Sequence, residues 1–114
     1  MSDLWTAIER DLNRLDSAID ELKELGAEKD AAERDYQSAK AKKALEMKAD
    51  RNPVTLIEMV IKGAVEVTKL LYARMRAQTM YDCCREEIMT IKLRLKIEND
   101  QLAREWEQAG TRNR

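Results

Sequence analysis

Apolar residues in the first part of the chain recur at steps of three and four, the spacing of one face of a coiled-coil helix. This seam consists of Ile8, Leu12, Leu15, Ile19 and Leu22. The spacing predicts a long helix over residues 3–50 whose apolar side packs against another helix.

The second part of the chain repeats this pattern over a similar length. Its seam consists of Val67, Leu70, Ala77, Tyr81, Cys84, Ile88, Ile91, Leu95 and Leu102. We therefore expect a second long helix over residues 64–108, followed by a polar tail at 109–114.

The first seam is interrupted at Leu25 and Gly26 and resumes more weakly at Ala32 and Tyr36. Either the helix continues through this point or Gly26 ends one helix before another begins. The residues that follow are rich in Ala, Glu and Lys, which favour helix and offer no turn chemistry, so we expect the helix to continue.

A proline separates the two long helices. Pro53 disfavours helical geometry in the residue before it, so the first helix should end near Asp50 to Asn52. Thr55 and Glu58 then have the spacing of a capping box. Val54 and Met59 have the positions of a hydrophobic staple. These residues predict a short, capped elbow helix at 56–62.

This elbow segment is apolar on almost all sides, so we expect it to be buried. Two helices of about 45 residues joined by a short connection fold back on each other most simply as an antiparallel pair. The sequence therefore predicts an all-α protein, a helical hairpin that forms a single domain over residues 1–114.

Five further apolar residues lie off the seam of the second helix, and one antiparallel partner helix cannot cover them all. They are Met75, Met80, Met89, Leu93 and Ile97. We expect a homodimer that forms a four-helix bundle or coiled coil, although an isolated hairpin with these residues on its surface remains the alternative.

The residue types do not favour catalysis. The chain contains no histidine, and its three glycines are isolated, so it lacks the common hydrolase triads and phosphate-binding loops. Cys83 and Cys84 are adjacent, which fits two reduced, partly buried thiols better than a metal or redox motif. Carboxylates such as Glu86-Glu87 and Asp20-Glu21 read as solvated faces, and we interpret Glu98 and Glu105 as part of the same charged surface. We expect no enzymatic activity, catalytic residue, cofactor or metal.

Charge is unevenly distributed although the formal net charge is only −1. Residues 1–30 carry nine acidic and four basic groups, whereas residues 40–76 carry nine basic and four acidic groups. The basic groups form a possible contact patch for phosphates or an acidic protein: Lys40, Lys42, Lys43, Lys48, Arg51, Lys62, Lys69, Arg74 and Arg76. Nucleic-acid binding is possible but not favoured, because only two tyrosines lie near this basic patch for base stacking.

No apolar run is long enough to span a membrane, and the N-terminus lacks the pattern of a signal peptide. We therefore expect a cytoplasmic protein with no membrane partner.

Several residues together resemble small α-helical proteins of tailed bacteriophages and prophages. The resemblance is carried by Tyr36, Asn52 to Glu58, Lys62-Gly63, Tyr81, Lys92 and Arg104 to Trp106, and it covers residues 30–107. It implies an early phage gene, often near recombination and single-strand-DNA-binding genes, active in the host cytoplasm. It implies no enzymatic activity and carries over no functional residue.

The leading hypothesis is a helical adaptor protein that assists phage DNA recombination or replication by binding another protein. Its basis is the wide apolar faces, the uneven charge and the lack of catalytic groups. One alternative is a phage inhibitor of a host defence system whose acidic N-terminal part competes with nucleic acid. Another is direct nucleic-acid binding through the basic patch.

Overall fold

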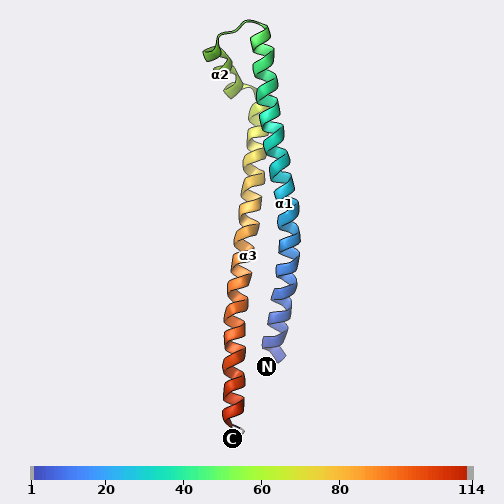
Figure 1. Cartoon of the computed structure of the whole chain (residues 1–114), viewed down its shortest axis with the longest axis vertical. Coiled ribbons are helices and arrows are strands. Elements are labelled where there is room, and N and C mark those ends of the chain that lie inside the picture. Colours follow the sequence, from blue (N-terminus) through green and yellow to red (C-terminus); the bar gives the residue numbers. More distant parts are fainter. Residues whose placement is uncertain (1, 113–114) are drawn as a thin grey trace. The chain divides into compact units, whose positions relative to one another are not determined.

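The computed structural model describes residues 2–112, which form three helices and no strand. These are α1 (Ser2–Ala49), α2 (Val54–Gly63) and α3 (Val65–Arg112), coloured from blue to red in Figure 1. The predicted all-α class is confirmed.

Helix α1 passes through Leu25 and Gly26 without a break, as expected. Gly26 does not have a positive φ, and a Cβ atom added there would lie 3.5 Å from the Tyr81 ring, an ordinary contact. Gly26 is therefore not a helix terminator. Helix α3 likewise continues beyond Gly110 to Arg112, past the predicted start of the tail, and residues 113–114 lie outside the described part.

The end of α1 is fixed by a turn just before Pro53. Arg51 has a φ of 61°, a left-handed conformation that costs about 1–2 kcal/mol for a residue other than glycine. Asn52 offsets this cost because its backbone N–H and its side-chain amide both donate to the carbonyl of Met47, each at 3.1 Å. The predicted helix end near Asp50 to Asn52 is confirmed.

The predicted capping box at the start of α2 is wrong. Pro53 itself is the N-cap, with φ −63° and ψ 150°, and no side chain bonds to the free N–H groups there. Because proline already holds this extended conformation, the helix begins at Val54, which leaves Thr55 inside the first turn. The staple is also absent, since Val54 and Met59 are both exposed.

The chain divides into two compact units, and each is described by itself. Unit 1 comprises residues 1–23 and 83–114. Within it the two helical segments are antiparallel: Asp11 contacts Arg94, and further along α1 the carbonyl of Ala18 accepts a hydrogen bond from the thiol of Cys84 at 3.3 Å.

The seam of unit 1 differs from the predicted one. Its buried residues are Ile8, Asp11 and Ala18 from α1, and Cys84, Ile88, Ile91, Leu95 and Glu98 from α3. Leu15, Leu22 and Leu102 are half-buried along the same line. The α3 part was predicted well, except that Glu98 takes a seam position.

Leu12 and Ile19, which we predicted for the core seam, are instead exposed by 47% and 36%. Asp11 and Ala18 take their places, one residue earlier in each case. With this register Leu25 follows Leu22 at a regular step of three, so the predicted interruption at Leu25 disappears.

Unit 2 comprises residues 24–82 and includes the whole of α2. Its buried apolar side chains are Leu25, Met47, Ile57 and Val67, and Tyr81 is half-buried. Here too α1 and α3 are antiparallel, since Lys29 contacts Tyr81 while Glu33 contacts Arg74. Helix α2 lies beside the C-terminal part of α1 (Figure 1).

Candidate interaction surfaces

A charged cluster occupies the centre of unit 1. The Asp11 side chain is 0% exposed, and Glu98 from α3 is also buried. Arg94 Nη1 lies 3.5 Å from Asp11 Oδ1. The prediction that Glu98 belongs to a solvated face is therefore wrong, because the helical repeat places it on the seam three residues after Leu95.

The pKa values of the two carboxyl groups in this cluster are shifted in opposite directions. The hydrogen bond from Glu98 lowers the pKa of Asp11, opposed by burial and assisted by the charge of Arg94. The same hydrogen bond, together with burial and the negative charge of Asp11, raises the pKa of Glu98. Asp11 Oδ2 and Glu98 Oε2 are both buried and have no hydrogen-bond partner in the structure, so a proton held between these two carboxyl groups would satisfy both atoms.

This cluster is suited to fixing helix register. Asp11 is closed to solvent, so a substrate cannot reach it in this structure. A polar pair on an otherwise apolar seam penalises any sliding of α1 along α3 that would leave it unpaired. Because folding shifts the pKa values of both carboxyl groups, we expect the pairing of these helices to depend on pH.

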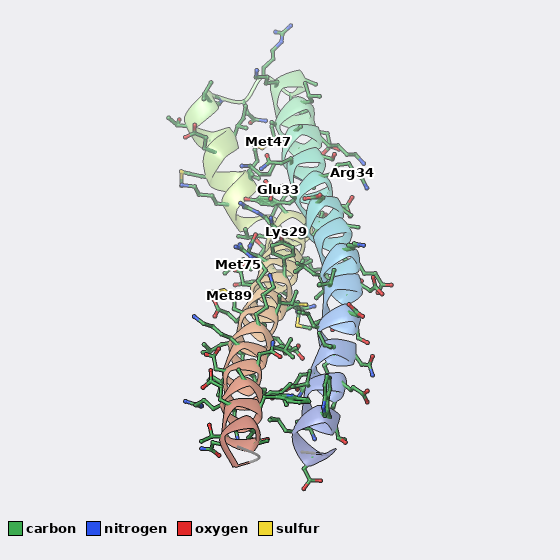
Figure 2. All side chains as sticks on the ribbon, turned by 60° about the horizontal axis from the view of Figure 1, so that its bottom comes forward. Lys29, Glu33, Arg34, Met47, Met75 and Met89 are labelled. Atoms are coloured by element: carbon green, nitrogen blue, oxygen red, sulfur yellow. The ribbon has the colours of Figure 1, made fainter. Side chains whose placement is uncertain are left out.

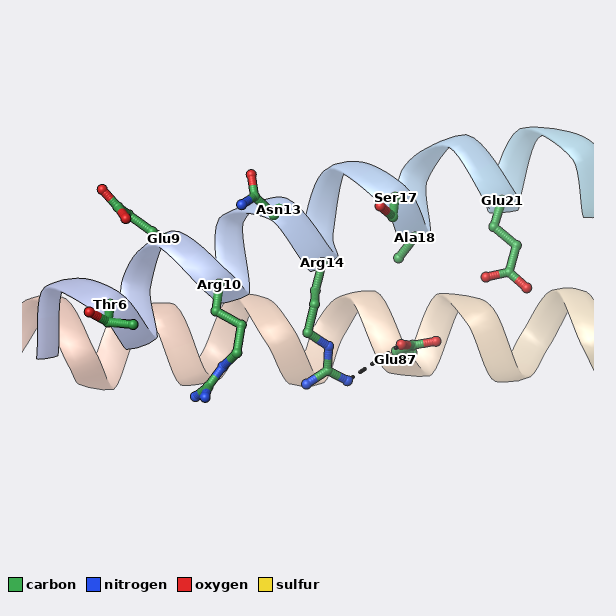
Figure 3. A pocket seen from close by; sticks show the side chains of 9 residues that line it. All are labelled: Thr6, Glu9, Arg10, Asn13, Arg14, Ser17, Ala18, Glu21 and Glu87. Carbon is green, nitrogen blue, oxygen red and sulfur yellow. Dashed lines mark ion pairs between the residues drawn. The ribbon is translucent and has the colours of Figure 1, made fainter. Parts of the chain in front are cut away.

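One side of unit 1 carries a shallow polar groove of about 530 Å³ (Figure 3). Arg10 and Arg14 extend from α1 toward α3, and Arg14 Nη2 lies 3.8 Å from Glu87 Oε1. Both members of this ion pair are about half exposed, so it contributes at most about 1 kcal/mol. With both signs of charge and an open form, the groove does not define a small-molecule site.

The opposite side of unit 1 carries a row of exposed apolar residues from α1. Trp5, Leu12 and Ile19 occur at intervals of seven residues on α1, and each is at least 36% exposed. Trp106 on α3 is also exposed. We call Trp5, Leu12 and Ile19 the α1 stripe. Met89, Leu93 and Ile97 on α3 are exposed as well, at the places off the seam where the sequence suggested them.

Unit 2 contains a cluster of cations around Tyr36. Arg74 Cζ and Lys40 Nζ lie 5.2 Å and 5.1 Å from the centre of its ring. Arg74 also forms an ion pair with Glu33. Figure 2 shows Glu33 on the side of α1 toward α3 and Arg34 on the outer side. These contacts hold Arg74 and Lys40 within the unit, where they are less available to an external phosphate.

The rest of the predicted basic patch is interleaved with carboxylates. Lys40 and Lys62 share a hollow with Glu58, and Lys42 and Lys43 share another with Glu46 and Glu66. Lys48, Arg51, Lys69 and Arg76 are exposed. The predicted groups thus all lie in unit 2, but carboxylates interrupt the positive field that they produce.

We accordingly expect no binding of a short single-stranded or duplex oligonucleotide at physiological salt. Fluorescence anisotropy of a labelled oligonucleotide tests this. Binding that weakens with salt and disappears on replacing Lys42, Lys43 and Arg51 by Glu would contradict the expectation and assign the patch to nucleic acid.

The two cysteines differ in environment. Cys83 is exposed and Cys84 is buried, and both are free thiols. Burial raises the pKa of Cys84, and the charges of Glu21 and Glu87 raise it further. A thiol held protonated in this way is a poor nucleophile and acts as a small apolar residue of the seam.

Helix α2 presents an unexpected surface. We predicted a buried elbow helix, yet only Ile57 is buried. Val54, Leu56 and Met59 are exposed, with 71% of Met59 accessible. Leu56 and Met59 are three positions apart and lie on the same side of the helix, and we call these two residues the α2 face. The connection before α2 places Ile57 against the rest of unit 2, and ten residues of helix cannot turn the other apolar side chains inward as well.

Within residues 2–112, no three acidic or cysteine side chains are grouped as metal ligands. None of the described helices combines the length and apolar character needed to cross a bilayer. Comparison of the chain with protein-family models, curated proteins and solved structures finds no match.

Proposed function

We propose that this chain is a non-enzymatic helical interaction protein that self-associates and binds a protein partner through its exposed apolar surfaces. The α2 face is the observation that carries this proposal. This short, largely apolar helix gains little by exposing Leu56 and Met59 on one side to water, unless another protein covers them.

Each of these side chains is worth about 1.5–3 kcal/mol when fully transferred from water to an apolar contact. Leu56 and Met59 can therefore supply part of the energy of a specific contact, from which the cost of association is deducted. Methionine suits such a surface, because its flexible, polarisable side chain adapts to the shape of a partner.

Introducing a negative charge on the α2 face tests whether this face binds a partner. We expect Leu56→Glu and Met59→Glu to weaken partner binding about tenfold or more while leaving helix content unchanged, because both side chains already face water. Affinity capture with each variant, followed by titration of the recovered partner, measures the effect.

Ser38→Glu is a matched control, since Ser38 is exposed on α1 in the same unit. A partner that binds the wild type and both α2 variants equally well would contradict the role of the α2 face.

The resemblance to phage-encoded helical proteins supports a search for this partner among proteins of DNA recombination and replication. Purified candidates of that class should be titrated against the intact chain.

A further inference from the structure

The α1 stripe lies on a defined side of unit 1. Arg14 directly precedes the seam residue Leu15, and Glu87 directly precedes the seam residue Ile88. The ion pair between them therefore marks one flank of the seam on both helices. In an antiparallel pair of helices the residues on one flank of α1 meet the same flank of α3, so the opposite flanks also share a side. Leu12 on α1 and Lys92 on α3 therefore border the same face of the unit.

This face carries opposite charges along its two edges. On α1 the stripe is bordered by Glu9 and Asp16, which directly follow the seam residues Ile8 and Leu15. On α3 the same face is bordered by Lys92 and Lys96, which follow Ile91 and Leu95. All four charged residues are exposed, and Met89 and Trp106 add exposed apolar surface to the α3 edge.

We propose that a second copy of this chain covers the α1 stripe, with α1 of each copy packed antiparallel against α3 of the other. This inference rests on the proposed self-association and assigns its interface. A two-fold axis parallel to the helices places the acidic edge of each copy against the basic edge of the other copy. The interface therefore contains two equivalent contacts of this kind.

The positions of the charged residues along the helix axes agree with this arrangement, where two residues are called level if they lie at the same height along those axes. Within unit 1, Asp11 is level with Arg94 and Arg14 is level with Glu87. The two-fold rotation preserves these levels, so Lys96 of the second copy comes level with Glu9. Lys92 of the second copy then lies between Glu9 and Asp16, and Met89 of the second copy comes close to Leu12.

We favour a second copy as the partner because each copy has both an acidic edge and a basic edge, so each can complement the other. The α1 stripe repeats every seven residues, which fits a helix of matching repeat rather than an extended peptide. The unit already presents such a helix with the complementary charge, and two units together form a four-helix bundle.

Charge exchange between the edges tests the interface. One variant carries Glu9→Lys and Asp16→Lys, and the other carries Lys92→Glu and Lys96→Glu. Each alone would place like charges across the interface, so we expect the dimer dissociation constant of each to rise about tenfold or more. Mixed in equal amounts, the two variants restore opposite charges on both sides and should form a heterodimer of wild-type affinity.

Light scattering of each variant and of the mixture gives the result, with circular dichroism to show that the helices persist. Leu12→Glu should also weaken the dimer, whereas Asp100→Lys with Glu107→Lys, exposed residues outside this face, should not. Suppose that the wild type is a dimer. If each charge variant alone then dimerises equally well, or if the mixture of the two stays monomeric, the proposed interface is wrong but self-association still holds. A monomeric wild type would overturn both.

Discussion

Ile91→Ala is expected to lower the free energy of unfolding by about 2–3 kcal/mol, toward the lower end of the range for large-to-small core substitutions. Ile91 is 1% exposed and lies at the centre of the unit 1 seam. The loss includes the transfer energy of the deleted methyl groups and a cavity term. That cavity term is moderated here because two helices can move together to close the gap.

Urea denaturation followed by circular dichroism measures this change, at equal protein concentration because self-association contributes to apparent stability. Leu93→Ala is the matched control: Leu93 is 60% exposed and lies on the same helix, so its loss should cost no more than about 0.5 kcal/mol. Equal effects of the two substitutions would show that α1 and α3 do not pack along the observed seam.

Glu98→Gln is expected to raise the free energy of unfolding by about 1–3 kcal/mol at neutral pH and to remove part of its pH dependence. Glutamine keeps the shape and the hydrogen-bond donor of the protonated carboxyl but never becomes a second buried charge beside Asp11. In the wild type, the folded state must either keep the proton on Glu98 or ionise two adjacent carboxyls.

The direction of the pH dependence follows from the two opposite pKa shifts. Because the pKa of Glu98 is raised in the folded state, the folded chain binds more protons, and stability falls as the pH rises from about 4.5 through the folded-state value. Because the pKa of Asp11 is lowered, stability also falls as the pH drops from about 3.8 through its folded-state value. The wild type should thus be most stable in the interval between these two changes.

Chemical denaturation between pH 3 and pH 8 tests this account. The Glu98→Gln variant should lose the decline above pH 4.5 and keep the decline at acid pH. Glu107→Gln, on an exposed position of the same helix, should leave the wild-type profile unchanged. A decline above pH 4.5 of the same size in the wild type and in Glu98→Gln would show that Glu98 is not the group that takes up the proton.

Helical periodicity predicted the helices and most of the α3 seam, because large apolar residues mark the seam positions there. It failed on α1, where two registers share Ile8, Leu15 and Leu22. Counting apolar residues favoured the register with Leu12 and Ile19, whereas packing selects the one with Asp11 and Ala18. The sequence did contain a signal for the correct choice, since Leu25 continues only the observed register.

The candidate surfaces were less predictable for a related reason. Glu98 was assigned to solvent by its charge alone, although its spacing from Leu95 places it on the seam. The α2 face was assigned to the interior by its apolar character alone, although a single short helix can bury only one side. The contacts of Arg74 with Glu33 and Tyr36 depend on which residues of α1 and α3 are level, which composition does not specify.

The molar mass of the intact chain in solution tests most directly whether its exposed apolar surfaces serve association. We expect light scattering over a range of concentrations to give twice the 13.2 kDa mass of one chain, with partial dissociation on dilution. A mass of 13.2 kDa at every concentration would contradict the proposed self-association.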